Sequence, residues 1–349
     1  NDITQTDVRV VNLNLGADGL AAGDQVTVNG RTVADDILVT AAAGVVNVAG
    51  LEYDVNVRGS VAAETDRLVV NGNDGDDRIK AAAGVEATIL ITLNGGLGDD
   101  YLSADALLIG GPGDDFLEGG AGADVLQGGP GEDTLVGGGG ADTIDGGEDF
   151  DTILVRGTLG NDLIDVFQPA PPVVNFTLNV TVGGVLDADT IVAAGAVPSV
   201  EQVLIEASAG DDLIRVGVAD VYTDLNLANG VAAQTLRFTV HGGEPNASDR
   251  LIVRDDGLGD LVLYRKGADG RSGSVTVGAA APVVFSEVER LDVTPLDNVD
   301  INGNGDTGTD GRGRLIVFAP DPFELNDTRR VSTAFDFLSR VAVHPTIDP

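Results

Sequence analysis

Aspartates recur every nine residues between Gly110 and Leu154, and each one follows a group of glycines. The pattern is Gly-Gly-x-Gly-x-Asp-x-Leu/Ile-x, and five tandem copies begin at Gly110, Gly119, Gly128, Gly137 and Gly146. A related copy, GGLGDDYLS, begins at Gly95. Carboxylate and turn carbonyl oxygens form the ligand set that Ca²⁺ prefers, and glycine lets the backbone approach an ion closely. The spacing therefore predicts calcium binding by these turns.

The same stretch has one aliphatic residue at a fixed position in each copy. These residues are Leu117, Leu126, Leu135, Ile144 and Ile153. A flexible Gly/Asp linker would need no such phase. We therefore expect the aliphatic residues to stack into a narrow core, with very short strands that depend on lateral stacking and on a metal.

The run resembles the RTX repeats, the haemolysin-type calcium-binding nonapeptides of secreted bacterial proteins. This resemblance implies a parallel β-roll in which two nonapeptides make one coil, with several Ca²⁺ ions between neighbouring turns. It places Asp115, Asp133 and Asp151 on one edge. Asp124 and Asp142 fall on the other edge, with Asp100 near its start. It also implies carbonyl ligands from the glycine loops, at Gly110, Pro112, Gly119, Ala121, Gly128, Pro130, Gly137 and Gly139.

The last copy, GGEDFDTIL, departs from this pattern because Asp149 replaces the third glycine. We expect the last site to be incomplete or capped. Stacked turns about 4.8 Å apart would bring carboxylates to roughly 5 Å, where they repel by about 3 kcal/mol at an effective dielectric constant near 20. Such a ladder needs cations.

A second repeat, which is longer and less regular, covers most of the chain and is expected to position these turns. We call it the looser repeat. Its six copies begin at Asp24, Asp66, Asp151, Glu201, Asp249 and Glu289, and each has a second acid about eleven residues later. Apolar and polar residues alternate within the copies, which predicts strands. Regular periods of this length indicate a solenoid or a similar array. The predicted fold class is all-β, a parallel β-roll or β-solenoid flanked by additional strand repeats.

Single turns in the looser repeat leave two interpretations open. Asp35, Asp36, Asp162 and Asp212 are either metal ligands or plain acidic turn residues, and the second interpretation is favoured. Asp77, in NGNDGDDRI, is predicted to be a ligand. DINGNGDTGTD, at 300–310, imitates an EF-hand loop but lacks the acid at its twelfth position, so a polar turn is expected.

The composition limits the kinds of molecule that the protein is expected to bind. The net charge is −36, which disfavours binding to nucleic acid and to anionic membranes. There is no cysteine for disulfides and no apolar run long enough for a membrane span. The chain begins at Asn1 and contains no methionine, so we expect a processed chain or part of a longer one, secreted to the cell exterior or surface.

We expect four segments: strand repeats at 1–94 with a possible donor strand at 1–15, the calcium-binding roll at 95–155, further strand repeats at 156–311, and a strand-rich tail at 312–349. The tail segment DPFELNDTRRVSTAF resembles the opening of bacterial pre-peptidase C-terminal domains. Such an incomplete β-segment would need a partner, either the solenoid itself or a neighbouring subunit that it joins by strand addition.

No catalytic constellation is visible in the sequence, so we expect a protein that is not an enzyme. The leading hypothesis is a calcium-stabilised subunit of an extracellular filament, sheath or surface layer, which assembles with its own copies by strand addition or end-to-end stacking. The alternative is a calcium-binding RTX module of a larger secreted enzyme or adhesin.

Overall fold

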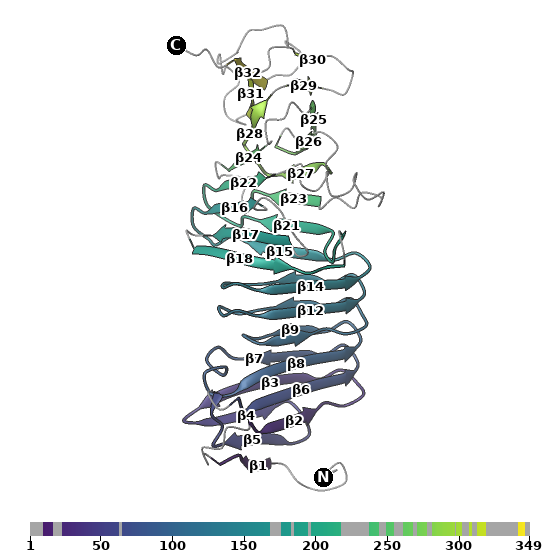
Figure 1. The fold of residues 1–349 in the computed structure, drawn as a ribbon, viewed down its shortest axis with the longest axis vertical. Coiled ribbons are helices and arrows are strands. Elements are labelled where there is room, and N and C mark those ends of the chain that lie inside the picture. Colours follow the sequence, from purple (N-terminus) through teal and green to yellow (C-terminus); the bar gives the residue numbers. More distant parts are fainter. Residues whose placement is uncertain are drawn as a thin grey trace. The chain divides into compact units, whose positions relative to one another are not determined.

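Figure 1 shows the fold of the chain in a computed structural model. The structure describes residues 10–16, 23–62, 65–167, 176–182, 185–194, 197–217, 237–243, 249–254, 261–267, 271–277, 281–296, 298–301, 307–308, 313–318 and 341–345. The chain divides into two compact units. Unit 1 comprises Asn1–Ile153 with Asp189–Val192, and unit 2 comprises Leu154–Ala188 with Ala193–Pro349.

Unit 1 is built from two sheets of short strands. In chain order these are β1 (Val10–Asn14), β2 (Gln25–Asn29), β3 (Asp36–Ala42), β4 (Val45–Ala49), β5 (Asp54–Arg58), β6 (Arg67–Asp74), β7 (Arg78–Ala81), β8 (Leu90–Leu97), β9 (Tyr101–Ser103), β10 (Leu107–Ile109), β11 (Phe116–Glu118), β12 (Val125–Pro130), β13 (Thr134–Val136) and β14 (Thr143–Glu148). Two further strands, β15 (Thr152–Arg156) and β18 (Val185–Ile191), belong to unit 1 only in part. One sheet runs β1-β5-β4-β3-β7-β9-β11-β13-β15, and the other runs β2-β6-β8-β10-β12-β14-β18.

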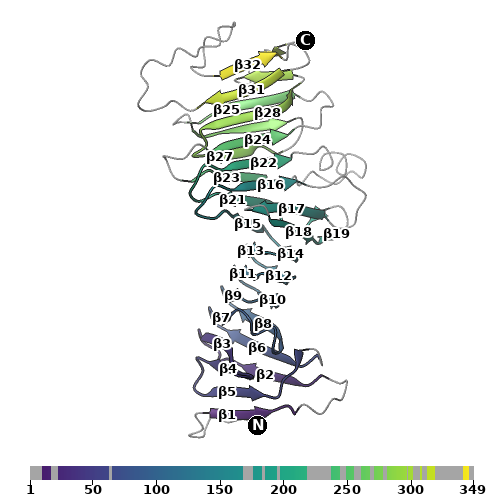
Figure 2. The ribbon, with the colours of Figure 1, turned by 90° about the vertical axis from the view of Figure 1, so that its left-hand side faces the viewer.

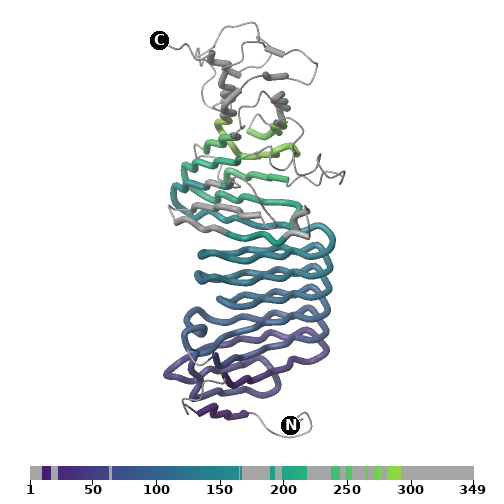
Figure 3. Tube along the Cα trace, viewed as in Figure 1, coloured from purple at the N-terminus to yellow at the C-terminus, as the bar shows by residue number. Residues whose placement is uncertain are grey.

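Successive strands from β6 to β15 alternate between the two sheets, and each pairs in parallel with the strand one coil away. Figures 2 and 3 show these coils stacked on one another. Leu117 pairs with Leu135 and Leu126 with Ile144, a spacing of two nonapeptides. The prediction of an all-β parallel roll with two nonapeptides in each coil is confirmed.

The core of unit 1 is a row of aliphatic side chains between the sheets. Leu117, Leu126, Leu135 and Ile144 are fully buried, and Ile153 is 1% exposed, as the sequence predicts. A strand such as β11 has three residues and buries only its central one. Each coil alone therefore has little to hold it, and its stability depends on the coils above and below.

The first strands depart from the parallel pattern. β3, β4 and β5 form an antiparallel meander, and β1 pairs in parallel with β5. The predicted donor strand at 1–15 therefore already has one partner in its own chain, along residues 10–14. Residues 1–9 lie outside the described part of the chain.

Unit 2 repeats the arrangement with longer and less regular connections. Its strands are β16 (Leu163–Phe167), β17 (Phe176–Val182), β19 (Ala193–Ala194), β20 (Val197–Pro198), β21 (Gln202–Glu206), β22 (Leu213–Gly217), β23 (Arg237–His241), β24 (Arg250–Arg254), β25 (Leu261–Lys266), β26 (Gly273–Val277), β27 (Val283–Ser286), β28 (Arg290–Leu296), β29 (Asn298–Ile301), β30 (Thr307–Gly308), β31 (Gly313–Phe318) and β32 (Val341–Pro345). β16, β22, β24 and β28 form a parallel ladder, and β21, β23 and β27 form a second one.

The C-terminal segments are only partly described. β31 and β32 are antiparallel, whereas the segment that resembles a pre-peptidase C-terminal domain and residues 302–306 of the loop at 300–310 lie outside the described residues. No helix in the described residues is long and apolar enough to cross a membrane.

Candidate metal centre

A ladder of aspartates follows one edge of unit 1. Its members precede β3, β7, β9, β11, β13 and β15, which belong to one sheet. The main-chain N–H of each aspartate donates to Oδ1 of the aspartate one coil further on, at 2.7–2.8 Å. The members in order are Asp35, Asp77, Asp100, Asp115, Asp133 and Asp151. We call this set the Asp115 edge.

The side chains of this edge point into the protein. Asp77, Asp100, Asp115 and Asp133 are each 3% exposed or less. Their Oδ1 atoms accept the ladder hydrogen bonds, whereas their Oδ2 atoms are buried and have no hydrogen-bond partner. A buried carboxylate oxygen without a partner is costly, so each Oδ2 needs a proton or a cation.

A main-chain carbonyl from the next coil lies beside the Oδ2 atoms of Asp77, Asp115 and Asp133. A Cβ added to Gly128 would contact both Asp133 Oδ2 and the carbonyl oxygen of Gly146. At Gly110 it would contact Asp115 Oδ2 and lie 2.7 Å from the carbonyl oxygen of Gly128. The first glycine of the nonapeptide thus keeps open a space that is lined by one anionic and one neutral oxygen, which fits Ca²⁺.

Burial raises the pKa of these carboxyl groups. Desolvation is the main cause, opposed by the ladder hydrogen bond and reinforced by the neighbouring aspartates, and it raises the pKa of Asp115 to about 8 and that of Asp100 to about 7. The pKa of Asp133 is raised to about 6, and that of Asp77 is also raised. Without a cation the edge therefore retains protons that a bound cation would displace.

The residue four positions before the aspartate separates two kinds of turn. In an open turn this residue has a positive φ, and the Oδ2 of the aspartate accepts no hydrogen bond. Open turns contain Asn73 before Asp77, Gly96 before Asp100, Gly111 before Asp115 and Gly129 before Asp133. The N–H groups of Gly96 and Gly111 donate to carbonyls of the next coil instead. In a closed turn the φ at this position is not positive, and its N–H donates to Oδ2.

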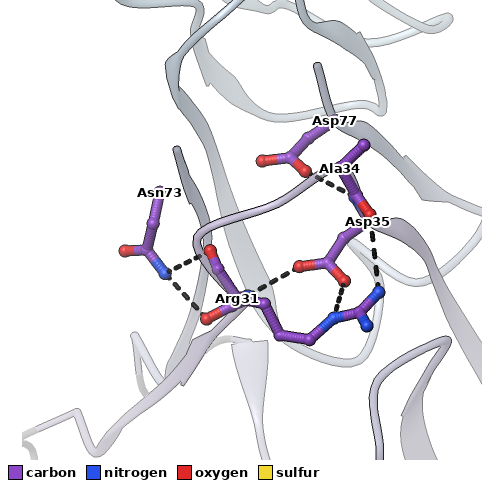
Figure 4. A network of polar contacts seen from close by, with 6 residues as sticks. Arg31, Ala34, Asp35, Asn73 and Asp77 are labelled. Atoms are coloured by element: carbon purple, nitrogen blue, oxygen red, sulfur yellow. Dashed lines mark hydrogen bonds and ion pairs between the residues drawn. The ribbon is translucent and has the colours of Figure 1, made fainter. Parts of the chain in front are cut away.

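The turn at Asp35 is closed, and it also contains a positively charged side chain, that of Arg31. The main-chain N–H of Arg31 donates to Asp35 Oδ2 at 2.6 Å, and its guanidinium Nε lies 2.7 Å from Oδ1 (Figure 4). Arg31 occupies the position of the second glycine in a nonapeptide. Both carboxylate oxygens of Asp35 are therefore satisfied by the chain, as the sequence interpretation of a metal-free turn requires.

Two further closed turns use neutral donors. Gly120 N–H donates to Asp124 Oδ2 at 2.8 Å, and Thr158 N–H donates to Asp162 Oδ2 at 2.6 Å. Asp124 was predicted as a ligand in the same way as Asp115, but its Oδ2 accepts a hydrogen bond that Asp115 Oδ2 lacks. The turn at Asp124 is therefore not equivalent to the turn at Asp115.

Asp100 lies on a different edge from the one expected. The sequence placed it near the start of the edge of Asp124 and Asp142, but Asp100 N–H donates to Asp115 Oδ1. The coil that it begins has 15 residues instead of 18, because its second turn is short. On the other edge Ala106, not an aspartate, donates its N–H to Asp124 Oδ1.

Several predicted carbonyl ligands also hold the coils together. The carbonyls of Gly110, Pro112, Gly128 and Pro130 accept N–H bonds from Gly96, Gly98, Gly111 and Gly113 respectively, at 2.9–3.0 Å. The Gly137 carbonyl lies beside the Cα of Gly119. On the same edge Ala121 donates its N–H to Asp105, and Gly139 donates to the carbonyl of Gly120. A carbonyl oxygen has two lone pairs, so one hydrogen bond leaves it able to bind a cation.

The last nonapeptide departs from the others in its backbone as well as its sequence. Asp149 adopts φ 78°, in the left-handed region where Gly113 and Gly131 have φ 140° and 137°. A residue with a Cβ is strained there. The fold thus holds Asp149 at a positive φ, although at a smaller angle than the glycines that it replaces.

The ladders include acids that sequence reasoning did not assign. Asp24 N–H donates to Asp66 Oδ1 and Asp142 N–H donates to Asp189 Oδ1 on the second edge of unit 1, and unit 2 adds Asp249 and Glu289. Asp66 and Asp249 begin copies of the looser repeat, a signal that could have identified them. Asp189 lies 47 residues after Asp142 and has no local signal.

In the described residues no group of three or more His, Cys, Asp or Glu side chains converges on one point. Any cation on the Asp115 edge must therefore take main-chain oxygens as well as carboxylates. A family model for the RTX calcium-binding nonapeptide repeat matches four copies, at residues 69–85, 92–106, 107–135 and 118–153. The chain carries RTX calcium-binding nonapeptide repeats.

The RTX copies include the open turns at Asp77, Asp100, Asp115 and Asp133, so the prediction of RTX repeats is confirmed. They leave out the closed turn at Asp35, which ends before residue 69. No curated protein matches the chain in sequence.

Proposed function

We propose that the chain is a secreted calcium-binding structural protein, a subunit of an extracellular filament, sheath or surface layer, and not an enzyme. The observation that carries the calcium part is the row of buried Oδ2 atoms without hydrogen bonds, of which those of Asp77, Asp115 and Asp133 lie beside a carbonyl oxygen of the next coil. Calcium holds these carboxylates ionised and links neighbouring coils.

The end of unit 1 supports the assembly part of the proposal. β1 is the terminal strand of its sheet in the described residues. Val10 on this strand is 46% exposed. An asparagine ladder reaches β1, since Asn47 donates to Asn56 and Asn56 to Asn12. Terminal strands of this kind pair readily with another chain, and asparagine ladders favour stacking in register.

Two measurements test the two parts separately. Calcium binding is tested by equilibrium dialysis of the full chain against Ca²⁺, where a chain that binds no calcium contradicts the proposal. Assembly is tested by light scattering and negative-stain microscopy in calcium, where filaments or sheets are expected. Monodisperse monomers would reject the filament and favour a calcium-binding module of a larger secreted protein.

A further inference from the structure

Unit 2 contains a third ladder, outside the residues that match the RTX repeat. Asp162 N–H donates to Asp212 Oδ1 at 2.7 Å, and Asp212 N–H donates to Asp249 Oδ1 at 2.9 Å. Asp249 N–H then donates to Glu289 Oε2 at 3.0 Å. The hydrogen bonds follow the rule of the Asp115 edge, although the spacings of 50, 37 and 40 residues hide it in the sequence.

The two ends of this ladder are satisfied by the chain. Thr158 closes the turn at Asp162, with both its N–H and its hydroxyl on the carboxylate. At the other end Arg271 lies 3.4 Å from Glu289 Oε1. The interior members differ, because the Oδ2 atoms of Asp212 and Asp249 are buried and accept no hydrogen bond.

The second residue of the turn has a positive φ before both interior members. Ser208, four residues before Asp212, has φ 77°, and Gly243, which follows Gly242 and lies six residues before Asp249, has φ 112°. These two residues lie against each other as the second residues of neighbouring nonapeptide turns do. A Cβ added to Gly243 would contact the carbonyl oxygen of Ser208, just as a Cβ added to Gly129 would contact that of Gly111.

Asp249 resembles Asp133 in its burial, in its raised pKa and in the space beside its Oδ2. It is fully buried, and burial raises its pKa to about 7. A Cβ added to Gly242 would contact the Glu287 carbonyl oxygen and lie 3.0 Å from Asp249 Oδ2. Glu287 belongs to the next coil of unit 2, so a carbonyl and a carboxylate again line a space that only glycine leaves open.

We propose that unit 2 binds a calcium ion at Asp249, through Asp249 Oδ2 and the Glu287 carbonyl, with Asp212 Oδ2 as the carboxylate of the neighbouring rung. Ca²⁺ accepts a carboxylate, a main-chain carbonyl and water in flexible geometry, whereas Mg²⁺ demands a near-ideal octahedron. The inference rests on the calcium chemistry proposed for unit 1, but its residues are different ones.

The experiment is hydrogen–deuterium exchange of the full chain in Ca²⁺ and in EDTA, read separately on peptides of each unit. In the wild type, calcium at 100 times its Kd is expected to slow exchange in β22 and β24 by up to about 100-fold. Asp249→Asn is expected to abolish this protection and to bind one calcium fewer in equilibrium dialysis, with unit 1 unchanged. Asp211→Asn removes an exposed charge from the neighbouring turn and serves as the matched control.

The outcomes separate this site from the one in unit 1. Wild-type protection in unit 1 without any in unit 2 overturns the inference and leaves the proposed function intact. Protection and calcium count unchanged in Asp249→Asn also overturn it, and show that the carboxyl group is simply protonated. No calcium-dependent protection in either unit overturns both. If Asp249→Asn proves unfolded in EDTA, the wild-type comparison alone decides.

Discussion

The turns at Asp35 and Asp133 each begin with a glycine and end with a buried aspartate. Only in the turn at Asp35 does the chain itself donate a hydrogen bond to the Oδ2 of the aspartate. In the first, Arg31 donates its N–H to Asp35 Oδ2 and places its guanidinium on Oδ1. In the second, Gly129 has φ 126°, and Asp133 Oδ2 has no hydrogen bond. The conformation of one residue, the second of the turn, therefore decides whether the carboxylate depends on an external cation, as the closed turn of Gly120 and the open turn of Gly129 show.

The largest effect should come from removing calcium. Each site filled at 1,000 times its Kd stabilises the folded state by about 4 kcal/mol, and the open turns at Asp77, Asp100, Asp115 and Asp133 would lose this together. We expect EDTA at pH 8 to unfold the coils from β6 to β15, or to lower their Tm sharply. Identical melting curves by circular dichroism, with and without chelator, would contradict the calcium sites.

Filling the space beside an open turn should be nearly as damaging. In Gly128→Ala the new Cβ meets Asp133 Oδ2 and the Gly146 carbonyl, neither of which can move far. We expect a loss of about 2–3 kcal/mol and weaker calcium binding. The control is Gly122→Ala, whose Cβ meets nothing closer than 3.9 Å. Equal urea midpoints for the two variants would show that the space has no special role.

Acidity should act in opposite directions with and without calcium. The pKa values of Asp100, Asp115 and Asp133 are raised to about 7, 8 and 6 in the folded chain, so the folded state without metal binds more protons than the unfolded state. The stability of the metal-free chain is therefore highest at or below about pH 4 and falls as the pH rises from about 4 to about 8.

With calcium present the carboxylates must be ionised, so stability should instead rise over the same range. Thermal melts at pH 5 and pH 8, in EDTA and in Ca²⁺, measure both slopes. If the metal-free chain melts at a higher temperature at pH 8, the carboxyl groups of the open turns are not protonated as inferred.

Arg31→Gly tests the comparison directly, because it converts a closed turn to the sequence of an open one. We expect the variant to bind one more calcium than the wild type and to melt lower in EDTA. Arg67→Ala, which removes an exposed arginine from β6, is the matched control for charge. An unchanged calcium count in equilibrium dialysis would show that Arg31 does not determine whether the turn takes a cation.

The smallest effect is expected at Asp149. Its left-handed φ of 78° costs energy that glycine would not incur, and the greater freedom of glycine in the unfolded chain offsets part of the gain. Asp149→Gly should stabilise the calcium-bound chain by about 0.5 kcal/mol. A lower urea midpoint would indicate that the Asp149 side chain stabilises the turn.

The sequence predicted the roll, its coil length and its core, because each depends on short-range periodicity. A strict period of nine with an aliphatic residue at one phase leaves few alternatives to stacked turns, and Leu117, Leu126 and Leu135 are buried as expected. It also identified Asp77, Asp100, Asp115 and Asp133, which line the open turns.

The predicted edge of Asp100 was wrong, because one turn of its coil is shorter than the nonapeptide pattern requires. This shortened turn changes the edge on which a count of nine residues places Asp100. A spacing of 15 residues is a full coil here, and only the pairing of β9 with β11 shows it.

The tertiary structure alone decided which aspartates lack a partner. That property depends on the φ of the second residue of the turn and on whether its N–H points toward the carboxylate or toward the next coil. Asp124 and Asp133 share a repeat motif but differ in this respect. Asp249 does not lie in a nonapeptide of the kind that contains Asp133, yet its Oδ2 is likewise buried and without a hydrogen bond. The sequence thus determined which positions in the turns carry a carboxylate. The packing of one coil against the next decided which of these carboxylates need a cation.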